Sequence, residues 1–118
     1  MASGTIQREN ALSGSNYCKM PDGTLLCWGE IGISGVTVTT AWGSAYESGR
    51  QNVSVSFPMT FKTAPTLLTR LRTSPVTFLE DNLSASTTGI GGAFWLMRPQ
   101  GISGVSGGIY WLAVGRWK

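Results

Sequence analysis

The side chains that most often do chemistry in proteins are sparse in this sequence. It holds no histidine and only two cysteines, Cys18 and Cys27. Without histidine the chain lacks the usual general base, metal ligand and pH switch, and two cysteines alone do not complete a four-ligand zinc site. A catalytic thiol also needs a neighbouring base that lowers its pKa. We therefore expect no catalytic residues, no metal site and no cofactor.

Carboxylates are the next candidates for acid–base chemistry. Glu80 and Asp81 are adjacent, whereas Glu30 and Glu47 lie far from them in the sequence. Glycoside hydrolysis needs two carboxyl groups that flank the scissile bond from opposite sides at a set separation, which neighbours on one loop do not provide. The alternation of Asp and Asn that is typical of a calcium-binding loop is also missing. We interpret these acids as solvated loop residues.

Tryptophan is abundant, with five copies in 118 residues. Most must lie in the core or between subunits, because a buried tryptophan contributes a large apolar area. Trp42 and Tyr46, however, lie in a glycine-bounded loop, where a ring can stack on a sugar while planar polar groups bind its hydroxyls. An inward-folded core position is an equally good interpretation of Trp42. The predicted ligand-binding residues are Trp42, Tyr46, Arg50, Glu80, Asp81, Asn82, Trp95 and Arg98.

The elements that must position these residues are β-strands. The C-terminal segment alternates so that one face holds Ile109, Trp111, Ala113 and Trp117, and the other holds Tyr110, Leu112 and Val114. A sandwich strand is usually apolar on one face only. A chain this small cannot cover both faces of a sheet. We therefore predict that further copies of the chain bury part of residues 110–117.

A hairpin is predicted near the start of the folded part, with its turn at residues 21–24. If Met20 pairs with Leu25 across this turn, Cys18 lies directly opposite Cys27, whereas a bulge would shift the register by one. Two separate thiols and a cross-strand disulfide both remain open.

The remaining strands are predicted from β-branched and aromatic residues between turn signals. They cover residues 36–40, 53–57, 66–72, 84–88 and 93–98. Within 53–57 we expect Val53, Val55 and Phe57 to face inward. Trp95 is expected to face away from Phe94 and Leu96 on its strand. Predicted loops cover residues 42–49, 75–83, which holds Glu80 to Asn82, and 100–107.

No window has the apolar spacing of a helix. The strand pattern therefore predicts one all-β domain, a small antiparallel β-sandwich, over residues 15–118. Residues 1–14 are polar and without a period, as in a linker or the end of a fibre stalk.

Charge and hydropathy limit the partners. The net charge of +3 comes from nine basic residues that are spread thinly, and the close ones are the pair Arg70 and Arg72 and the pair Arg116 and Lys118. Binding to a phosphate backbone needs several cations along one track, so we expect no nucleic-acid partner. No apolar run approaches the roughly 20 residues that span a bilayer, and no secretory signal is visible. We therefore expect no membrane partner, and assembly in the cytoplasm with reduced thiols.

Three segments together carry a family resemblance. They are residues 17–29 (YCKMPDGTLLCWG), 53–65 (VSVSFPMTFKTAP) and 110–117 (YWLAVGRW). In this order and spacing they resemble the C-terminal tip domains of tail-fibre and receptor-binding proteins of phages and prophages. The middle and the end are also similar to the H-type lectins, which are small sugar-binding sandwiches. No positions here match the acidic, basic and aromatic sugar-site residues of those lectins.

The resemblance implies a six-to-eight-stranded antiparallel sandwich that assembles as a parallel homotrimer. It implies a place at the tip of a virion tail fibre, joined to the rest of the fibre through the N-terminus, and binding to a bacterial cell-surface glycan without catalysis. A structural trimerisation cap without a ligand site of its own is the alternative function. An envelope-degrading enzyme is disfavoured, because no nucleophile–base or carboxylate pair is visible.

Overall fold

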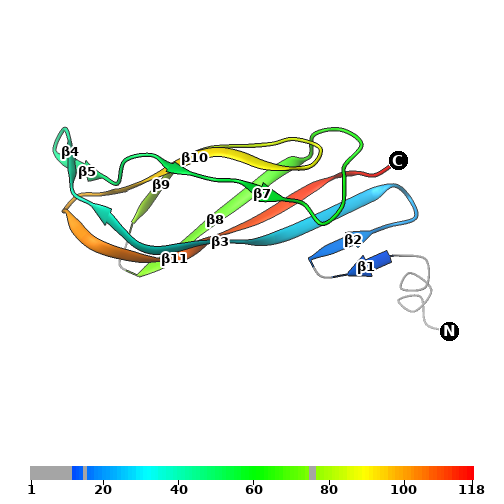
Figure 1. Cartoon of the computed structure of the whole chain (residues 1–118), viewed down its shortest axis with the longest axis horizontal. Coiled ribbons are helices and arrows are strands. Elements are labelled where there is room, and N and C mark those ends of the chain that lie inside the picture. The colour runs from blue at the N-terminus through cyan, green and yellow to red at the C-terminus, as the bar shows by residue number, and fades with distance from the viewer. Residues whose placement is uncertain (1–11, 15, 75–76) are drawn as a thin grey trace.

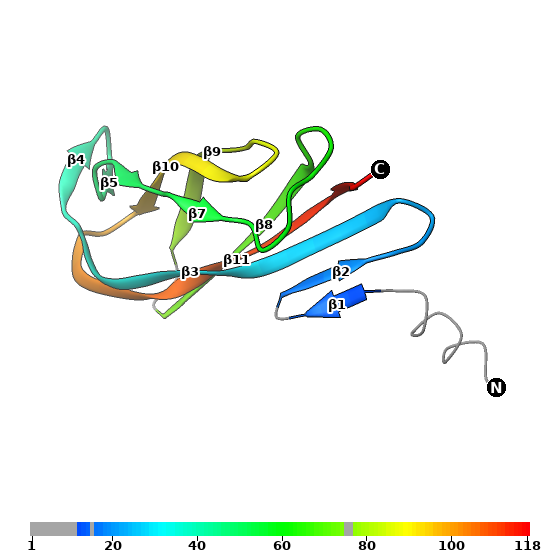
Figure 2. The same cartoon turned by 45° about the vertical axis from the view of Figure 1, so that its right-hand side comes forward.

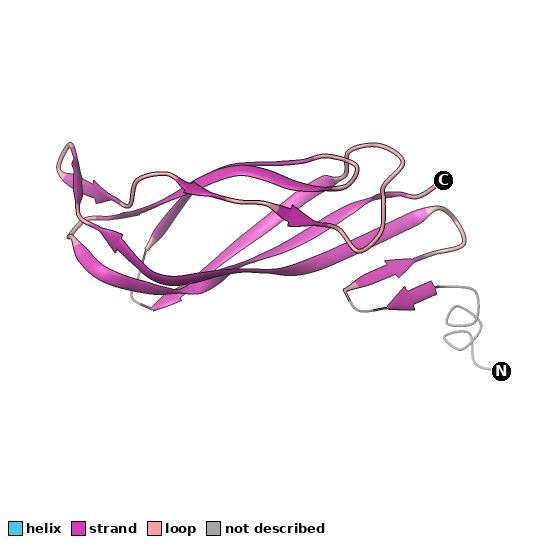
Figure 3. Cartoon of the chain, viewed as in Figure 1, coloured by secondary structure: helices cyan, strands magenta, loops and turns pink. Residues whose placement is uncertain are grey.

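The computed structural model describes residues 12–14, 16–74 and 77–118. These residues form eleven β-strands and no helix (Figures 1 and 3). Every pair of bonded strands is antiparallel. Nothing in this described part of the chain is a helix long and apolar enough to cross a membrane. The predicted all-β antiparallel fold is confirmed.

The first sheet, called sheet A here, is built on two long strands. Its order is β1 (Leu12–Gly14), β2 (Tyr17–Lys19), β3 (Thr24–Val38), β11 (Ile102–Arg116) and β8 (Thr66–Ser74). β3 and β11 pair over most of their length, and β8 pairs with the other edge of β11. The last strand of the chain therefore lies between two others.

The second sheet, sheet B, is organised around β10 (Gly89–Arg98). One edge of β10 pairs with β9 (Phe78–Ala85) from end to end. Its other edge is shared by three short strands, β5 (Ala45–Glu47), β6 (Gln51–Asn52) and β7 (Val55–Ser56), and β4 (Thr40–Trp42) pairs with β5. Figure 2 shows sheet B as a layer above β3 and β11 of sheet A.

The core lies between the two sheets. Sheet A contributes alternate residues of β3 and β11, and sheet B contributes Ile90, Phe94 and Leu96. The segment between β7 and β8 adds Phe57 and Phe61, whose ring centres are 5.1 Å apart in an edge-to-face contact. Pro58 ends the strand without moving these rings out of the core. Buried aromatic pairs of this kind contribute about 0.5–1.5 kcal/mol beyond their area.

The predicted faces of two strands are confirmed. Ile109, Trp111 and Ala113 are buried on the inner face of β11, and Tyr110 is exposed on the outer face. In the segment 53–57, Val53 and Phe57 are buried, and Val55 packs against the core. Alternation therefore located the inner faces correctly where apolar residues recur with a period of two.

The β2–β3 hairpin forms as predicted but closes one residue earlier than expected. The Gly23 N–H donates to the Met20 carbonyl at 3.1 Å, and the Met20 N–H donates to the Thr24 carbonyl at 2.8 Å. Gly23 has the left-handed φ of 103° that closes a three-residue hairpin loop with a glycine bulge. Met20 therefore lies opposite Thr24 rather than Leu25.

This register separates the two cysteines. Cys18 lies opposite Leu26, and Cys27 lies opposite Tyr17. The prediction that Cys18 lies opposite Cys27 is wrong, because a shift of one residue moves a side chain to the other face of the sheet. Cys27 faces the core and Cys18 the outer face of sheet A, and both thiols are free.

Several predicted loops are strands. Residues 78–83 belong to β9, so Glu80, Asp81 and Asn82 do not lie on a loop. Residues 102–107 belong to β11, and residues 42–49 contain the β4–β5 hairpin. Of the predicted strand 84–88, only 84 and 85 are in a strand. Pairing with neighbouring strands outweighs the low β-propensity of glycine and polar residues.

The molecule is elongated, with principal extents of 58 × 28 × 18 Å. Its radius of gyration is 17.5 Å, whereas a compact domain of this length has about 13.5 Å. Figure 1 shows β1 and the C-terminus at one end and the β4–β5 hairpin at the other. Residues 1–11 lie outside the described residues, so the predicted linker stays a prediction there, and Leu12–Gly14 forms β1.

The outer face of sheet A carries an apolar patch, which consists of Leu26, Trp28, Leu68, Tyr110, Leu112 and Val114. Leu112 pairs with Trp28 on β3 and with Leu68 on β8, so the three side chains form one row across the sheet. Leu68 is 54 % exposed and Trp28 is 39 % exposed. The prediction that the last strand is apolar on both faces is confirmed.

Candidate functional site

Sheet B collects most of the predicted ligand-binding residues on its outer face. Trp95 points outward, because Phe94 and Leu96 on either side of it are buried in the core. Glu80 lies directly opposite Trp95 on β9, and Asn82 lies two residues further along β9. Side chains of directly opposed residues share a face, so Trp95, Glu80 and Asn82 lie together.

Trp42 extends this outer face at the hairpin end of the molecule. It pairs with Ala45 across a tight turn, in which Gly43 supplies a positive φ of 61°. The side chain is 58 % exposed, so the interpretation of Trp42 as a core residue does not hold. Phe78 at the start of β9 is 59 % exposed and pairs with Met97 on β10.

These aromatic residues border a surface hollow of about 260 Å³, called the hairpin hollow here. Its lining residues are Trp42, Ser44, Ala45, Phe78, Met97, Arg98 and Pro99. The lining is mostly apolar, and the Arg98 guanidinium is its only charged group. Arg98 also donates from Nη1 to the Gln100 carbonyl at 3.4 Å. The hollow thus combines exposed ring surface with one multiple hydrogen-bond donor.

A second polar–aromatic group lies next to it along β10. The Arg50 guanidinium carbon is 5.7 Å from the centre of the Trp95 ring, which is cation–π range. Arg50 also donates from Nε to Asn52 Oδ1 at 2.9 Å. These contacts fix the guanidinium beside the ring. The outer face of sheet B therefore continues from the hairpin hollow as a mixed surface rather than an apolar one.

Two predicted site residues, Tyr46 and Asp81, do not lie on the outer face of sheet B. Tyr46 is half-buried and packs against the core. The Asp81 carboxylate accepts a hydrogen bond from the Thr69 hydroxyl on β8 at 3.0 Å, and this bond joins the two sheets at their open edge. Because residues 80–82 form a strand, Asp81 necessarily faces away from Glu80 and Asn82. Tyr46 and Asp81 thus serve the fold.

Sequence reasoning missed Phe78 and Met97. The sequence predicts a loop over residues 75–83, and a loop has no alternation that would place Phe78 on a face. The signal was present, since Leu79 and Leu83 mark the inner face of β9 and place Phe78 outside. Met97 follows from the same alternation that located Trp95.

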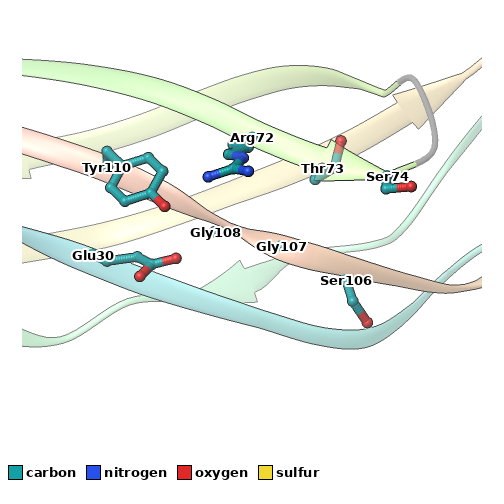
Figure 4. Close-up of a pocket in the computed structure, with 8 residues that line it drawn as sticks. All are labelled: Glu30, Arg72, Thr73, Ser74, Ser106, Gly107, Gly108 and Tyr110. Carbon is teal, nitrogen blue, oxygen red and sulfur yellow. The ribbon is translucent and has the colours of Figure 1, made fainter.

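A further hollow of about 280 Å³ lies on the opposite side of the molecule, on the outer face of sheet A (Figure 4). Glu30, Arg72 and Tyr110 line one end of it, and Ser74 and Ser106 line the other. None of these residues was predicted as a site residue.

Metal binding finds no support among the described residues. No group of three or more His, Cys, Asp or Glu side chains that could hold a metal ion occurs in them.

Comparison with known proteins identifies a family. Residues 19–116 match the family model described as tail fiber protein gp53-like, C-terminal. No curated protein and no solved structure matches the chain. The match spans every strand from β3 to β11 and includes all eight predicted site residues. The chain belongs to the gp53-like tail fiber protein family, as the C-terminal domain of a phage tail fibre component.

Proposed function

We propose that this domain is a non-catalytic receptor-binding module, which attaches the tail fibre to a carbohydrate on the bacterial surface. The observation that carries the proposal is the hairpin hollow, where Trp42 and Phe78 each expose more than half of their surface beside Arg98. Clustered large apolar side chains on a surface usually mark a site of ligand or partner contact.

The chemistry of the hollow fits a sugar. A pyranose ring has an apolar C–H face and a rim of hydroxyl groups. An exposed indole or phenyl ring matches the first, and a guanidinium that donates several hydrogen bonds matches the second. The volume of about 260 Å³ is below the roughly 300–1,000 Å³ of pockets for drug-sized ligands, which favours a single sugar unit over a peptide segment.

The position of the hollow supports the same function. It lies at the end of the molecule that carries the β4–β5 hairpin, whereas β1 lies at the other end (Figure 1). A fibre that continues from the β1 end would hold the hairpin hollow away from itself and toward a cell surface.

The domain acts, in this proposal, as a homotrimer that buries the Trp28, Leu112 and Leu68 row of the apolar patch between copies and leaves Tyr110 at the edge of the contact. The exposed Leu68 and Trp28 side chains support burial against another chain, and the number of copies follows from the resemblance to tail-fibre tips. Three hairpin hollows per tip raise a weak intrinsic affinity, because the second and third contacts are intramolecular.

A structural trimerisation cap is the second candidate function, and the apolar patch is the observation that favours it. A cap needs only that patch and assigns no role to Trp42 and Phe78. The two functions therefore differ in what happens when the hairpin hollow is altered and the patch is left intact.

Trp42→Ala tests the proposal, with Trp42→Phe as the variant that keeps a ring and Thr40→Ala as a control on the same hairpin. Binding is measured on an array of bacterial surface polysaccharides. We expect Trp42→Ala to weaken binding at each site roughly tenfold, the loss of about 1.4 kcal/mol. Trp42→Phe and Thr40→Ala should bind nearly like wild type, and no variant should change the melting temperature much, since Trp42 is exposed.

Two results would contradict the proposal. A wild-type protein that forms trimers and binds no polysaccharide on the array would favour the cap. Release of reducing ends from a bound polysaccharide would show that the domain is catalytic.

A further inference from the structure

The hollow on sheet A arises where large side chains give way to glycine. The outer face of β11 reads Val114, Leu112, Tyr110, Gly108 and Ser106, in that order along the strand. Gly108 pairs with Gly32 on β3 and with Arg72 on β8. The apolar patch therefore ends at Tyr110, and Gly108 leaves a gap in the row of large side chains beyond it.

Gly108 leaves room for the Glu30 side chain. A Cβ atom on Gly108 would collide with the Glu30 carboxylate, because that carboxylate lies over the glycine. The cross-strand partner Gly32 differs, since a Cβ atom there would meet nothing within 4 Å. Gly108 therefore lets an acid from β3 reach across β11 into the hollow.

Three functional groups lie around Gly108 in this hollow. Figure 4 shows the Glu30 carboxylate reaching toward β11 from one side and the Arg72 guanidinium from the other, with the Tyr110 ring beside them. Within the described residues, the Glu30 and Arg72 side chains make no hydrogen bond or ion pair. One acceptor, one donor and one ring thus face the same open space with unused hydrogen-bonding capacity.

We propose that this hollow, lined by Glu30, Arg72 and Tyr110, is a second saccharide site and takes a neutral pyranose unit. The Tyr110 ring stacks on the sugar, Glu30 accepts hydrogen bonds from two neighbouring hydroxyls, and Arg72 donates to their oxygens. The opposite charges of Glu30 and Arg72 leave the hollow without net charge, which suits a neutral unit.

This inference rests on the proposed carbohydrate-binding function and deepens it. The hollow borders the apolar patch and shares Tyr110 with it, so in an assembly that buries Leu112 and Val114 the site lies at the edge of the contact between copies. The hairpin hollow and this hollow occupy opposite faces of the sandwich. One trimer could then contact a branched or repeating glycan at two kinds of site.

Glu30→Gln and Arg72→Gln test the inference, with Arg70→Gln as the matched control. Arg70 lies two residues from Arg72 on the same face of β8 and does not line the hollow. The probes are glucose, galactose and N-acetylglucosamine, followed by NMR chemical shifts, together with the polysaccharide array. We expect both hollow variants to weaken sugar binding at least about tenfold, since each loses a charge-assisted hydrogen bond, and Arg70→Gln to leave it unchanged.

A glycine pair gives an independent test. Gly108→Ala displaces Glu30 and should weaken binding, whereas Gly32→Ala adds a methyl group in open space and should not. One outcome overturns this inference and leaves the proposed function standing. In it, Trp42→Ala loses the binding seen in wild type, whereas Glu30→Gln and Arg72→Gln bind like wild type. Absence of any glycan binding by wild type overturns both. Binding lost together with a change of oligomeric mass assigns Glu30 and Arg72 to the contact between copies and overturns the saccharide site.

Discussion

At the scale of single residues, the two cysteines have different surroundings although they are close in the sequence. Cys27 is fully buried, and desolvation raises the pKa of its thiol above the ordinary value. Cys18 is half-buried on the outer face of sheet A, beside the apolar patch. Thiol reactivity requires the thiolate. Cys27 is therefore protected from alkylation and oxidation, because its sulfur is buried and its raised pKa keeps the thiol protonated.

This difference predicts a labelling pattern. In a Cys18→Ala variant, Cys27 is the only thiol, and we expect it to resist iodoacetamide at neutral pH until the protein unfolds. Mass spectrometry before and after addition of denaturant measures this. Cys27→Ala, as a second variant, should lower the free energy of unfolding by about 1–2 kcal/mol, because it leaves a small cavity. Rapid alkylation of Cys27 in the native protein would contradict its position in the core.

At the scale of elements, C-terminal residues form hydrogen bonds with the turn of the β2–β3 hairpin. The Trp117 indole N–H donates to the Met20 carbonyl at 2.6 Å, and its backbone N–H donates to the Gly23 carbonyl at 2.9 Å. Arg116 donates from Nη2 to the Asp22 carbonyl at 2.6 Å. Lys19 lies over the Trp117 ring at 4.2 Å. The last residues of the chain thereby hold a turn that lies far away in the sequence.

Asp22 makes this turn sensitive to acid. Its carboxylate accepts a hydrogen bond from the Thr24 N–H at 2.8 Å, and this bond, with a smaller effect of the Arg116 and Lys118 charges, lowers the pKa of Asp22. A carboxyl group with a lowered pKa in the folded state stabilises the fold above its unfolded pKa of about 3.9, and this contribution disappears as the pH falls through the lower folded pKa.

Asp22→Asn should remove that pH dependence. We expect the variant to be less stable than wild type near neutral pH, and the difference to shrink as the pH falls below about 4. Urea denaturation at a series of pH values measures it, with Glu80→Gln as a control at an exposed carboxyl group on another element. A stability difference that grows in acid would contradict the assigned role of Asp22.

The same elements show what sequence alone could predict. Alternation of apolar residues gave the inner faces of β11 and the outward direction of Trp95 correctly. It failed at residues 100–107, because glycine and serine carry no apolar period and become a strand only through pairing with β3 and β8. The position of Trp42 could not be decided either, because a short loop segment has no period that tells an exposed ring from a core ring. The hollow on sheet A is lined by Glu30, Arg72 and Tyr110 from three different strands, and no local sequence pattern predicts that these strands lie side by side.

At the scale of the whole molecule, the two outer faces of the sandwich differ in character. Sheet A presents the apolar patch, with Trp28, Leu68 and Leu112 in one row. Sheet B presents Trp42 and Phe78 at the hairpin hollow, and Trp95 beside the Arg50 guanidinium. An elongated slab with one apolar outer face can bury that face in an assembly and keep the other in solvent, which agrees with the two roles proposed for the domain.

Leu112→Arg tests the assembly. Leu112 faces outward, so an arginine there disturbs the patch and leaves the core in place. We expect wild type to scatter light as a homotrimer and Leu112→Arg to scatter as a monomer, because a buried unpaired charge costs several kcal/mol at each contact. Ser84→Arg, which adds the same charge to an exposed position on β9, should remain trimeric. A monomeric wild-type protein at micromolar concentration would contradict the assembly.

In the proposed role of attaching a tail fibre to a cell, the long pairing of β3 with β11 has a mechanical consequence. β3 leads from the β2 hairpin at one end of the slab directly to the β4–β5 hairpin at the other (Figure 1). A pull between those ends runs along the strands and therefore perpendicular to their ladder of hydrogen bonds. The covalent backbone of β3 carries this load, and the ladder with β11 keeps the strand extended, so its hydrogen bonds do not open one after another as they would in a peeled sheet. In the proposed receptor-binding role, tension on an attached particle would therefore pass along β3 without unravelling the domain.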